Sequence, residues 1–166
     1  MAPAQPQSKF AQSEFADSKA GEPRLFLPFL QRFYDAAIPL SWPIVRIAVG
    51  WNLLVHGWGK IMIGPTDAFL KGFADLGFTP PAFWFWSSTA IETLAGISFI
   101  LGLFTRFFAA AAAIEMLTIT VLYWNNGFGW MHRGYEYTLL WGLVCFAIAL
   151  RGGGPYSIDR KLGREL

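Results

Sequence analysis

Six ionisable side chains lie inside apolar stretches of this 166-residue sequence. They are Arg46, His56, Lys60, Glu92, Glu115 and Glu136. An ionisable group inside the hydrocarbon core of a membrane is costly, so such groups face protein or water and often mark functional sites. These residues are therefore the first candidates for a site.

Arg46, Glu92 and Glu115 form the first candidate set, a buried polar centre. With ~1.5 Å of rise per residue, Arg46, Glu115 and Glu92 lie roughly 10, 13 and 16 Å from the inner ends of their spans, so the three can meet near the middle of the bundle. One arginine facing two carboxylates leaves a spare negative charge, so one carboxylate would tend to hold a proton in a low dielectric. The alternative is a structural ion pair that sets helix register without doing chemistry.

A second candidate set lies toward the opposite end of the helices and could form a ligand pocket. It consists of His56, Lys60, Asn125, Asn126, His132 and Glu136. Taken alone, Lys60 is expected to extend to the lipid headgroups. The alternative role of His56 is a single hydrogen bond between helices.

Catalytic and cofactor motifs are missing from the sequence. It contains no HExxH, CxxCH, GxSxG, Walker A or GxGxxG motif, so no metal site and no catalytic residue are predicted. The single cysteine, Cys145, cannot form an intrachain disulfide and does not support a metal site. The protein is therefore not expected to be an enzyme on its own.

The composition indicates an integral membrane protein. Hydrophobic residues make up 54% of the chain and charged residues 14%, against roughly 25% charged residues in a typical soluble domain. The net charge of +2 is too small to argue for nucleic acid as a partner.

Four apolar segments predict an all-α fold, a bundle of four transmembrane helices. A spanning helix needs roughly 20 apolar residues, and the candidates are residues 39–63, 82–103, 106–124 and 135–150. Between the first two, "GPTDAFLKGFADLGFTPP" predicts a short amphipathic helix capped by Thr66 or Asp67. Pro80 and Pro81 suit the start of the second span.

Helical spacing predicts which face of the first span is buried. Arg46, Gly50, Leu53, Gly57 and Lys60 recur at intervals of four and three residues and share one side. The two glycines would let a neighbouring backbone approach closely, as small residues do between membrane helices. Thr89, Glu92 and Gly96 repeat this pattern on the second span.

The charges predict the domain organisation and its orientation. Residues 1–37 form a flexible tail and a surface amphipathic segment, 38–152 the four-helix domain, and 153–166 a second tail. Nine cations, Lys9, Lys19, Arg24, Arg32, Arg106, Arg151, Arg160, Lys161 and Arg164, would share one side of the membrane, and three, Lys60, Lys71 and Arg133, the other. The positive-inside rule then places both termini in the cytoplasm.

Several short stretches together resemble the DoxX family of small four-helix bacterial membrane proteins, which includes DoxD-like subunits. The stretches are "HGWGKI", "FADLGFTPP", "IETLAGISFILGLFTR", "GYEYTLL" and "GGGPYSID", and the resemblance covers residues 40–160. It implies a component of the bacterial inner membrane that is associated with oxidoreductase systems, often linked to quinones. The second candidate set would then be the quinone pocket.

The function expected from this resemblance is a membrane subunit of a bacterial quinone-linked redox complex, serving as an anchor or helping to form a quinone site. Its partners would be the lipid bilayer and other membrane subunits, or further copies of the same chain. A small proton-linked transporter and a purely structural assembly subunit are the alternatives. Four short spans without a visible inverted repeat argue against a conventional transporter.

Overall fold

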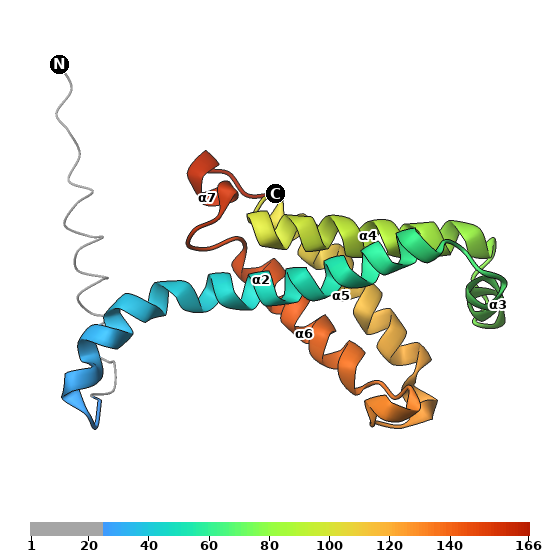
Figure 1. Cartoon of the computed structure of the whole chain (residues 1–166), viewed down its shortest axis with the longest axis horizontal. Helices are drawn as coiled ribbons and strands as arrows, with labels where there is room; N and C mark the ends of the chain where they lie inside the picture. The colour runs from blue at the N-terminus through green and yellow to red at the C-terminus, as the bar shows by residue number, and fades with distance from the viewer. Residues whose placement is uncertain (1–24) are drawn as a thin grey trace, which may run out of the picture. The chain divides into compact units, whose positions relative to one another are not determined.

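The computed structural model describes residues 25–166, which contain helices and no strand (Figure 1). The predicted all-α fold is confirmed for these residues. The chain divides into two compact units, Met1–Ile38 and Pro39–Leu166, and each is described by itself.

The described part of the first unit, residues 25–38, holds the short 3-10 helix η1 (Pro28–Leu30) and the start of α2 (Gln31–Ile63). Gln31 Nε2 donates a hydrogen bond of 2.9 Å to Asp35 Oδ1, and the side chains of Phe26, Phe29 and Phe33 are exposed. The flexible tail predicted for residues 1–23, with Lys9, Lys19 and Arg24 among the cations of that region, lies outside the described residues.

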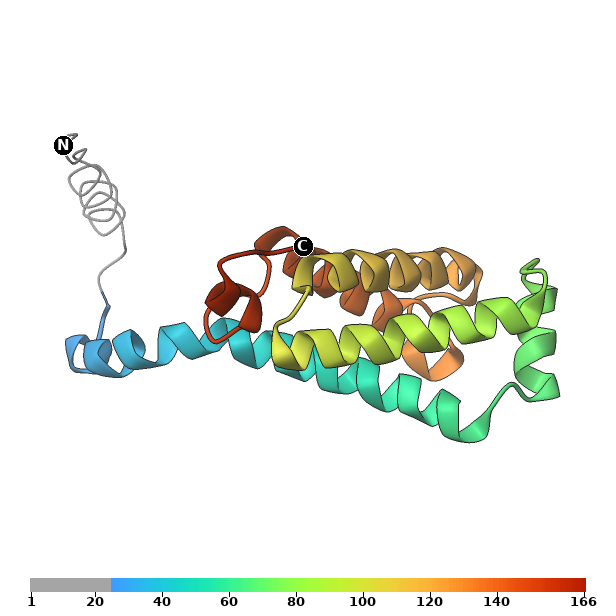
Figure 2. The ribbon, with the colours of Figure 1, turned by 90° about the horizontal axis from the view of Figure 1, so that it is seen from above.

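The second unit contains the rest of α2 and the helices that follow it. They are α3 (Asp67–Asp75), α4 (Pro81–Leu101), α5 (Thr105–Leu122), η2 (Trp124–Asn126), η3 (Trp130–His132), α6 (Glu136–Arg151) and α7 (Ile158–Leu162). Helices α4, α5 and α6 run in alternating directions, and α5 packs against both others (Figure 2). Gly102 turns the chain between α4 and α5 with a left-handed φ of 67°, a conformation that favours glycine.

The amphipathic helix predicted between the first two spans is α3. Thr66 is its cap, because the Thr66 side chain accepts a hydrogen bond from the backbone nitrogen of Phe69. The Phe69 ring packs on Phe85 of α4 with 5.5 Å between centroids. Pro81 is the first residue of α4, as its sequence position predicts.

Small residues hold α2 and α4 in close contact. A Cβ atom added to Gly57 would lie 2.7 Å from the backbone nitrogen of Thr93, and one added to Gly96 would lie 2.7 Å from that of Leu54. Neither position has room for a side chain, so the two backbones touch there. The buried face predicted for α2 is confirmed, since Arg46, Gly50, Leu53 and Gly57 are all buried.

Two of the described helices are long and apolar enough to cross a membrane, Pro28–Ile63 and Thr105–Leu122. Helix α4 has 21 residues and α6 has 16. Helices therefore occur at all four predicted segments, but four membrane spans are not confirmed.

Candidate functional site

An ion pair joins the last turn of α2 to the middle of α4. Lys60 Nζ lies 2.9 Å from Glu92 Oε1 and donates a hydrogen bond of 2.6 Å to Ser88 Oγ. The Lys60 side chain is 19% exposed and the Glu92 side chain 6% exposed. Such a pair lies in a low dielectric, where its mutual attraction is strong and the removal of one partner is costly.

Glu115 of α5 brings a second carboxylate to this pair. Its polar neighbours are Ser88, Glu92 and Lys60. It also interacts electrostatically with the thiol of Cys145 in α6. Both carboxylate oxygens of Glu115 are buried, and neither has a hydrogen-bond partner within 3.5 Å among the described residues, although the Ser88 side chain is near enough to interact with this carboxylate. We call Lys60, Ser88, Glu92 and Glu115 the carboxylate centre.

The carboxylate centre has more acceptors than donors. Glu92 Oε2 is also buried without a hydrogen-bond partner in the described part of the chain. A buried polar group left unsatisfied costs about 1–3 kcal/mol, and more if it is charged. The centre can therefore accept a proton.

Arg46 is not part of this centre. Its side chain is 1% exposed, its Nη1 donates 2.6 Å to the carbonyl oxygen of Gly153, and its Nη2 donates 3.1 Å to that of Tyr156. This corrects the ion-pair partners expected for Arg46, which were Glu92 and Glu115. The role of these residues in a functional site stays a prediction.

The direction of helical side chains explains the difference. A Cα–Cβ bond in an α-helix tilts toward the helix N-terminus, so Arg46 and Lys60 both reach back along α2. Helix α4 runs opposite to α2 (Figure 2), so the Glu92 side chain tilts toward the C-terminal end of α2. Glu92 thereby approaches Lys60 and moves away from Arg46.

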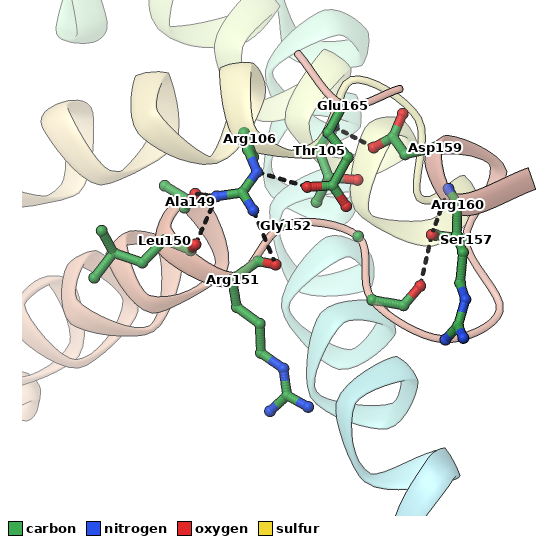
Figure 3. Close-up of polar contacts among 12 residues, drawn as sticks. Thr105, Arg106, Ala149, Leu150, Arg151, Gly152, Ser157, Asp159, Arg160 and Glu165 are labelled. Carbon is green, nitrogen blue, oxygen red and sulfur yellow. Dashed lines mark hydrogen bonds and ion pairs between the residues drawn. The ribbon is translucent and has the colours of Figure 1, made fainter. Parts of the chain in front are cut away.

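The chain after α6 packs at the end of α5 that holds Thr105 and Arg106 (Figure 3), and its Gly153 and Tyr156 carbonyl oxygens are the partners of Arg46. We call residues 152–166 the C-terminal segment. Asp159, 1% exposed, accepts hydrogen bonds from the backbone nitrogens of Phe104 (2.8 Å) and Thr105 (2.9 Å) at the start of α5. Arg106 Nε pairs with Glu165 at 2.6 Å, and its Nη1 donates to the last carbonyl oxygens of α6.

The second predicted set divides in the structure. Lys60 belongs to the carboxylate centre, whereas the side chains of His56, Asn125, Asn126 and His132 are exposed. The expectation that Lys60 extends to the headgroups is corrected, because Lys60 turns inward to Glu92.

Two residues of that set bind the backbone of the loop between α5 and α6. Asn126 Nδ2 donates 3.0 Å to the carbonyl oxygen of Arg133, and Glu136 accepts 3.3 Å from the backbone nitrogen of Trp130. Within residues 25–166, no hydrogen bond or ion pair connects this loop to Lys60 or His56, and no group of three His, Cys, Asp or Glu residues could hold a metal ion.

Ser88 and Asp159 were missed by reasoning from the sequence. Ser88 lies one helical turn before Glu92, so the i, i+4 spacing on one face of α4 was a usable signal. Asp159 had no such signal, since its partners, the nitrogens of Phe104 and Thr105, lie 55 and 54 residues away in the sequence.

The family model described as DoxX matches residues 41–124. This is slightly more than half of the chain, and the protein belongs to the DoxX family, a family of membrane proteins. The matched region contains Arg46 and the whole carboxylate centre and ends before α6 and the C-terminal segment. No curated protein and no solved structure matches the chain.

Proposed function

We propose that this protein is a membrane subunit of a bacterial quinone-linked redox assembly and that its carboxylate centre binds the quinone headgroup. In this proposal the chain crosses the inner membrane four times, with both termini in the cytoplasm. The observation that supports the proposal is Glu115, whose two buried oxygens accept no hydrogen bond within 3.5 Å from the described residues although they lie beside the Lys60–Glu92 pair.

The chemistry of the centre fits both redox states of a quinone. A quinol hydroxyl donates hydrogen bonds, and Glu115 and Glu92 Oε2 offer free acceptors. A quinone carbonyl accepts hydrogen bonds, and Lys60 and Ser88 carry donors. Reduction of a quinone to a quinol also consumes protons, which carboxylates inside a membrane can hold or release.

No electron carrier is assigned to this chain, and the redox chemistry would come from partner subunits. The chain would contribute binding and positioning of the headgroup, and the apolar faces of its helices would contact lipid and neighbouring subunits. Isolation of the intact assembly from native membranes tests this part, because a partner carrying flavin, haem or an iron–sulfur cluster should co-purify.

Competition photolabelling tests the headgroup site. A photoreactive quinone analogue should label the protein in membranes, and excess unlabelled quinone should prevent it. Glu115→Leu removes the two acceptor oxygens of Glu115 at similar side-chain size and leaves Glu92 Oε2 in place. It should weaken labelling roughly 10-fold or more, since hydrogen bonds to charged groups contribute about 1.5–3 kcal/mol. Lys71→Gln, which changes an exposed cation of α3, is the matched control.

Labelling that is absent from the parent protein, or equal in Glu115→Leu and the control, would overturn the quinone role. Protein level and melting temperature should be measured for each variant, so that loss of labelling is not loss of fold. If the Lys60–Glu92 pair only sets helix register, Glu115→Leu should leave labelling unchanged.

A proton-linked transporter is the second candidate function, and the ratio of charges favours it. Two carboxylates surround one lysine in the centre, so a proton can satisfy Glu115 without any other ligand. Proteoliposomes with an imposed pH gradient and an internal pH dye distinguish the two functions. A proton flux that Glu115→Leu abolishes, without quinone labelling, would establish the transporter instead.

A further inference from the structure

The C-terminal segment carries an excess of exposed positive charge. Arg160, Lys161 and Arg164 are exposed on it, and Arg151 is exposed just before it. None of the ion pairs found among residues 25–166 includes any of these four cations. The Arg151 guanidinium lies over the Trp42 ring, 4.5 Å from its centroid, whereas Arg160, Lys161 and Arg164 are available to an external anion.

The acidic side chains of the same segment are already engaged. Asp159 is buried and accepts from the two backbone nitrogens at the start of α5, and Glu165 pairs with Arg106. Figure 3 shows the guanidinium groups of Arg151 and Arg160 extending away from these contacts, with no interaction to the residues drawn. The positive charge is thus not neutralised within the segment.

The position of the segment relative to α5 indicates where these cations lie. Asp159 bonds directly to Phe104 and Thr105, and the backbone nitrogen of Phe107 donates 2.9 Å to the carbonyl oxygen of Leu166. Helix α5 has 18 residues and can cross a membrane by length and composition. At ~1.5 Å per residue it is about 27 Å long, close to the ~30 Å of a hydrocarbon core. In the proposed topology, in which α5 crosses the membrane, its first residue lies near a membrane surface.

Apolar side chains accompany the cations. Tyr156, Leu162 and Leu166 are 67%, 62% and 67% exposed. Cations mixed with exposed aromatic and aliphatic side chains are typical of segments that lie in the headgroup region of a membrane. An acidic protein surface would match the charges but not these apolar side chains.

We infer that the C-terminal segment is a binding surface for anionic phospholipid headgroups, with Arg160 and Lys161 as its principal contacts and Arg151 and Arg164 beside them. The lipid phosphate accepts hydrogen bonds from the guanidinium and ammonium groups, while Leu162 and Tyr156 contact the upper part of the acyl chains. The surface is independent of the carboxylate centre and of any quinone role.

The test uses the full chain, delipidated in detergent and titrated with phosphatidylglycerol or phosphatidylcholine under native mass spectrometry. The parent protein should bind phosphatidylglycerol more tightly than phosphatidylcholine. A basic residue near an anionic surface contributes roughly 5-fold in affinity, so Arg160→Gln with Lys161→Gln should weaken phosphatidylglycerol binding about 25-fold and leave phosphatidylcholine binding unchanged. The backbone nitrogens of residues 160 and 161 keep their hydrogen bonds to Ser157 in this variant, so the fold should be retained.

The matched control removes two cations from the other end of the helices, Lys71→Gln with Arg133→Gln, and should change phosphatidylglycerol binding less than 2-fold. Equal binding of the two lipids by the parent protein, or an equal loss in both double variants, would overturn the inference. Displacement of phosphatidylglycerol by millimolar inorganic phosphate would indicate a site for free phosphate. Binding of soluble polyglutamate, together with no preference between the two lipids, would indicate a site for acidic proteins. Either result would also overturn it.

Discussion

Lys60 Nζ and Glu92 Oε1 lie 2.9 Å apart and join the last turn of α2 to the middle of α4. The pair is mostly buried, and the nearby Gly57 brings the α2 backbone against Thr93 of α4. Close backbone packing and the ion pair thus act at the same crossing of the two helices. The contact between α2 and α4 at this crossing therefore positions Lys60 and Glu92 of the carboxylate centre.

The first prediction concerns the energy of the Lys60–Glu92 pair. Lys60→Met leaves Glu92 buried without its cation and should lower the free energy of unfolding in detergent by about 3 kcal/mol. Adding Glu92→Leu should recover part of that loss, with a coupling of roughly 1–3 kcal/mol. The exposed pair Lys71–Asp75 is the control and should show coupling below about 1 kcal/mol. Additive effects at Lys60 and Glu92 would contradict the pairing.

The second prediction concerns Arg46. Arg46→Ala removes the hydrogen bonds to the carbonyl oxygens of Gly153 and Tyr156, at about 1.5–3 kcal/mol for each bond to a charged group. Amide hydrogen exchange in residues 153–162 should become faster, while exchange in α3 stays unchanged.

A combined variant tests whether Arg46 is separate from the carboxylates. Adding Glu92→Gln and Glu115→Gln to Arg46→Ala should not restore stability, because distant sites add within roughly 0.5 kcal/mol. Restoration by the two glutamines would mean that Arg46 meets the carboxylates after all.

The third prediction compares two glycines of α2. Gly57→Ala places a Cβ against the backbone of Thr93 and should destabilise the protein by about 1–3 kcal/mol through overpacking. Gly59→Ala meets nothing within 4 Å and should stabilise the helix by about 0.5–1 kcal/mol. Thermal unfolding of the two purified variants should therefore shift in opposite directions. A shift in the same direction would argue against the close approach of α2 and α4.

The fourth prediction concerns membrane topology. Reporter fusions at Arg106 and Ser157 should read cytoplasmic and one at Asp75 periplasmic, because the sequence divides its cations nine to three between the two sides. Periplasmic activity of a fusion at Ser157 would reverse the orientation. Equal readings at Asp75 and Arg106 would show that α4 does not cross the membrane.

The sequence alone determined the features that depend on local or periodic interactions. A cap at Thr66 or Asp67, of which the structure selects Thr66, the start of α4 at Pro81 and the glycine face of α2 are each set by residues within a few positions of one another. A hydroxyl that accepts from a nearby backbone nitrogen, a proline without an N–H and a spacing of three and four residues are all visible in the printed chain.

Only the tertiary structure decided which groups the buried cations meet. Depth along the helices predicted Arg46 as the ion-pair partner of Glu92. Because side chains tilt toward the N-terminus of their own helix, the antiparallel helices α2 and α4 instead bring Lys60 to Glu92. Arg46 instead binds the Gly153 carbonyl 107 residues later, a partner with no distinctive residue type, because every residue has a carbonyl. Such contacts depend on how distant segments pack, and helical periodicity carries no information about them.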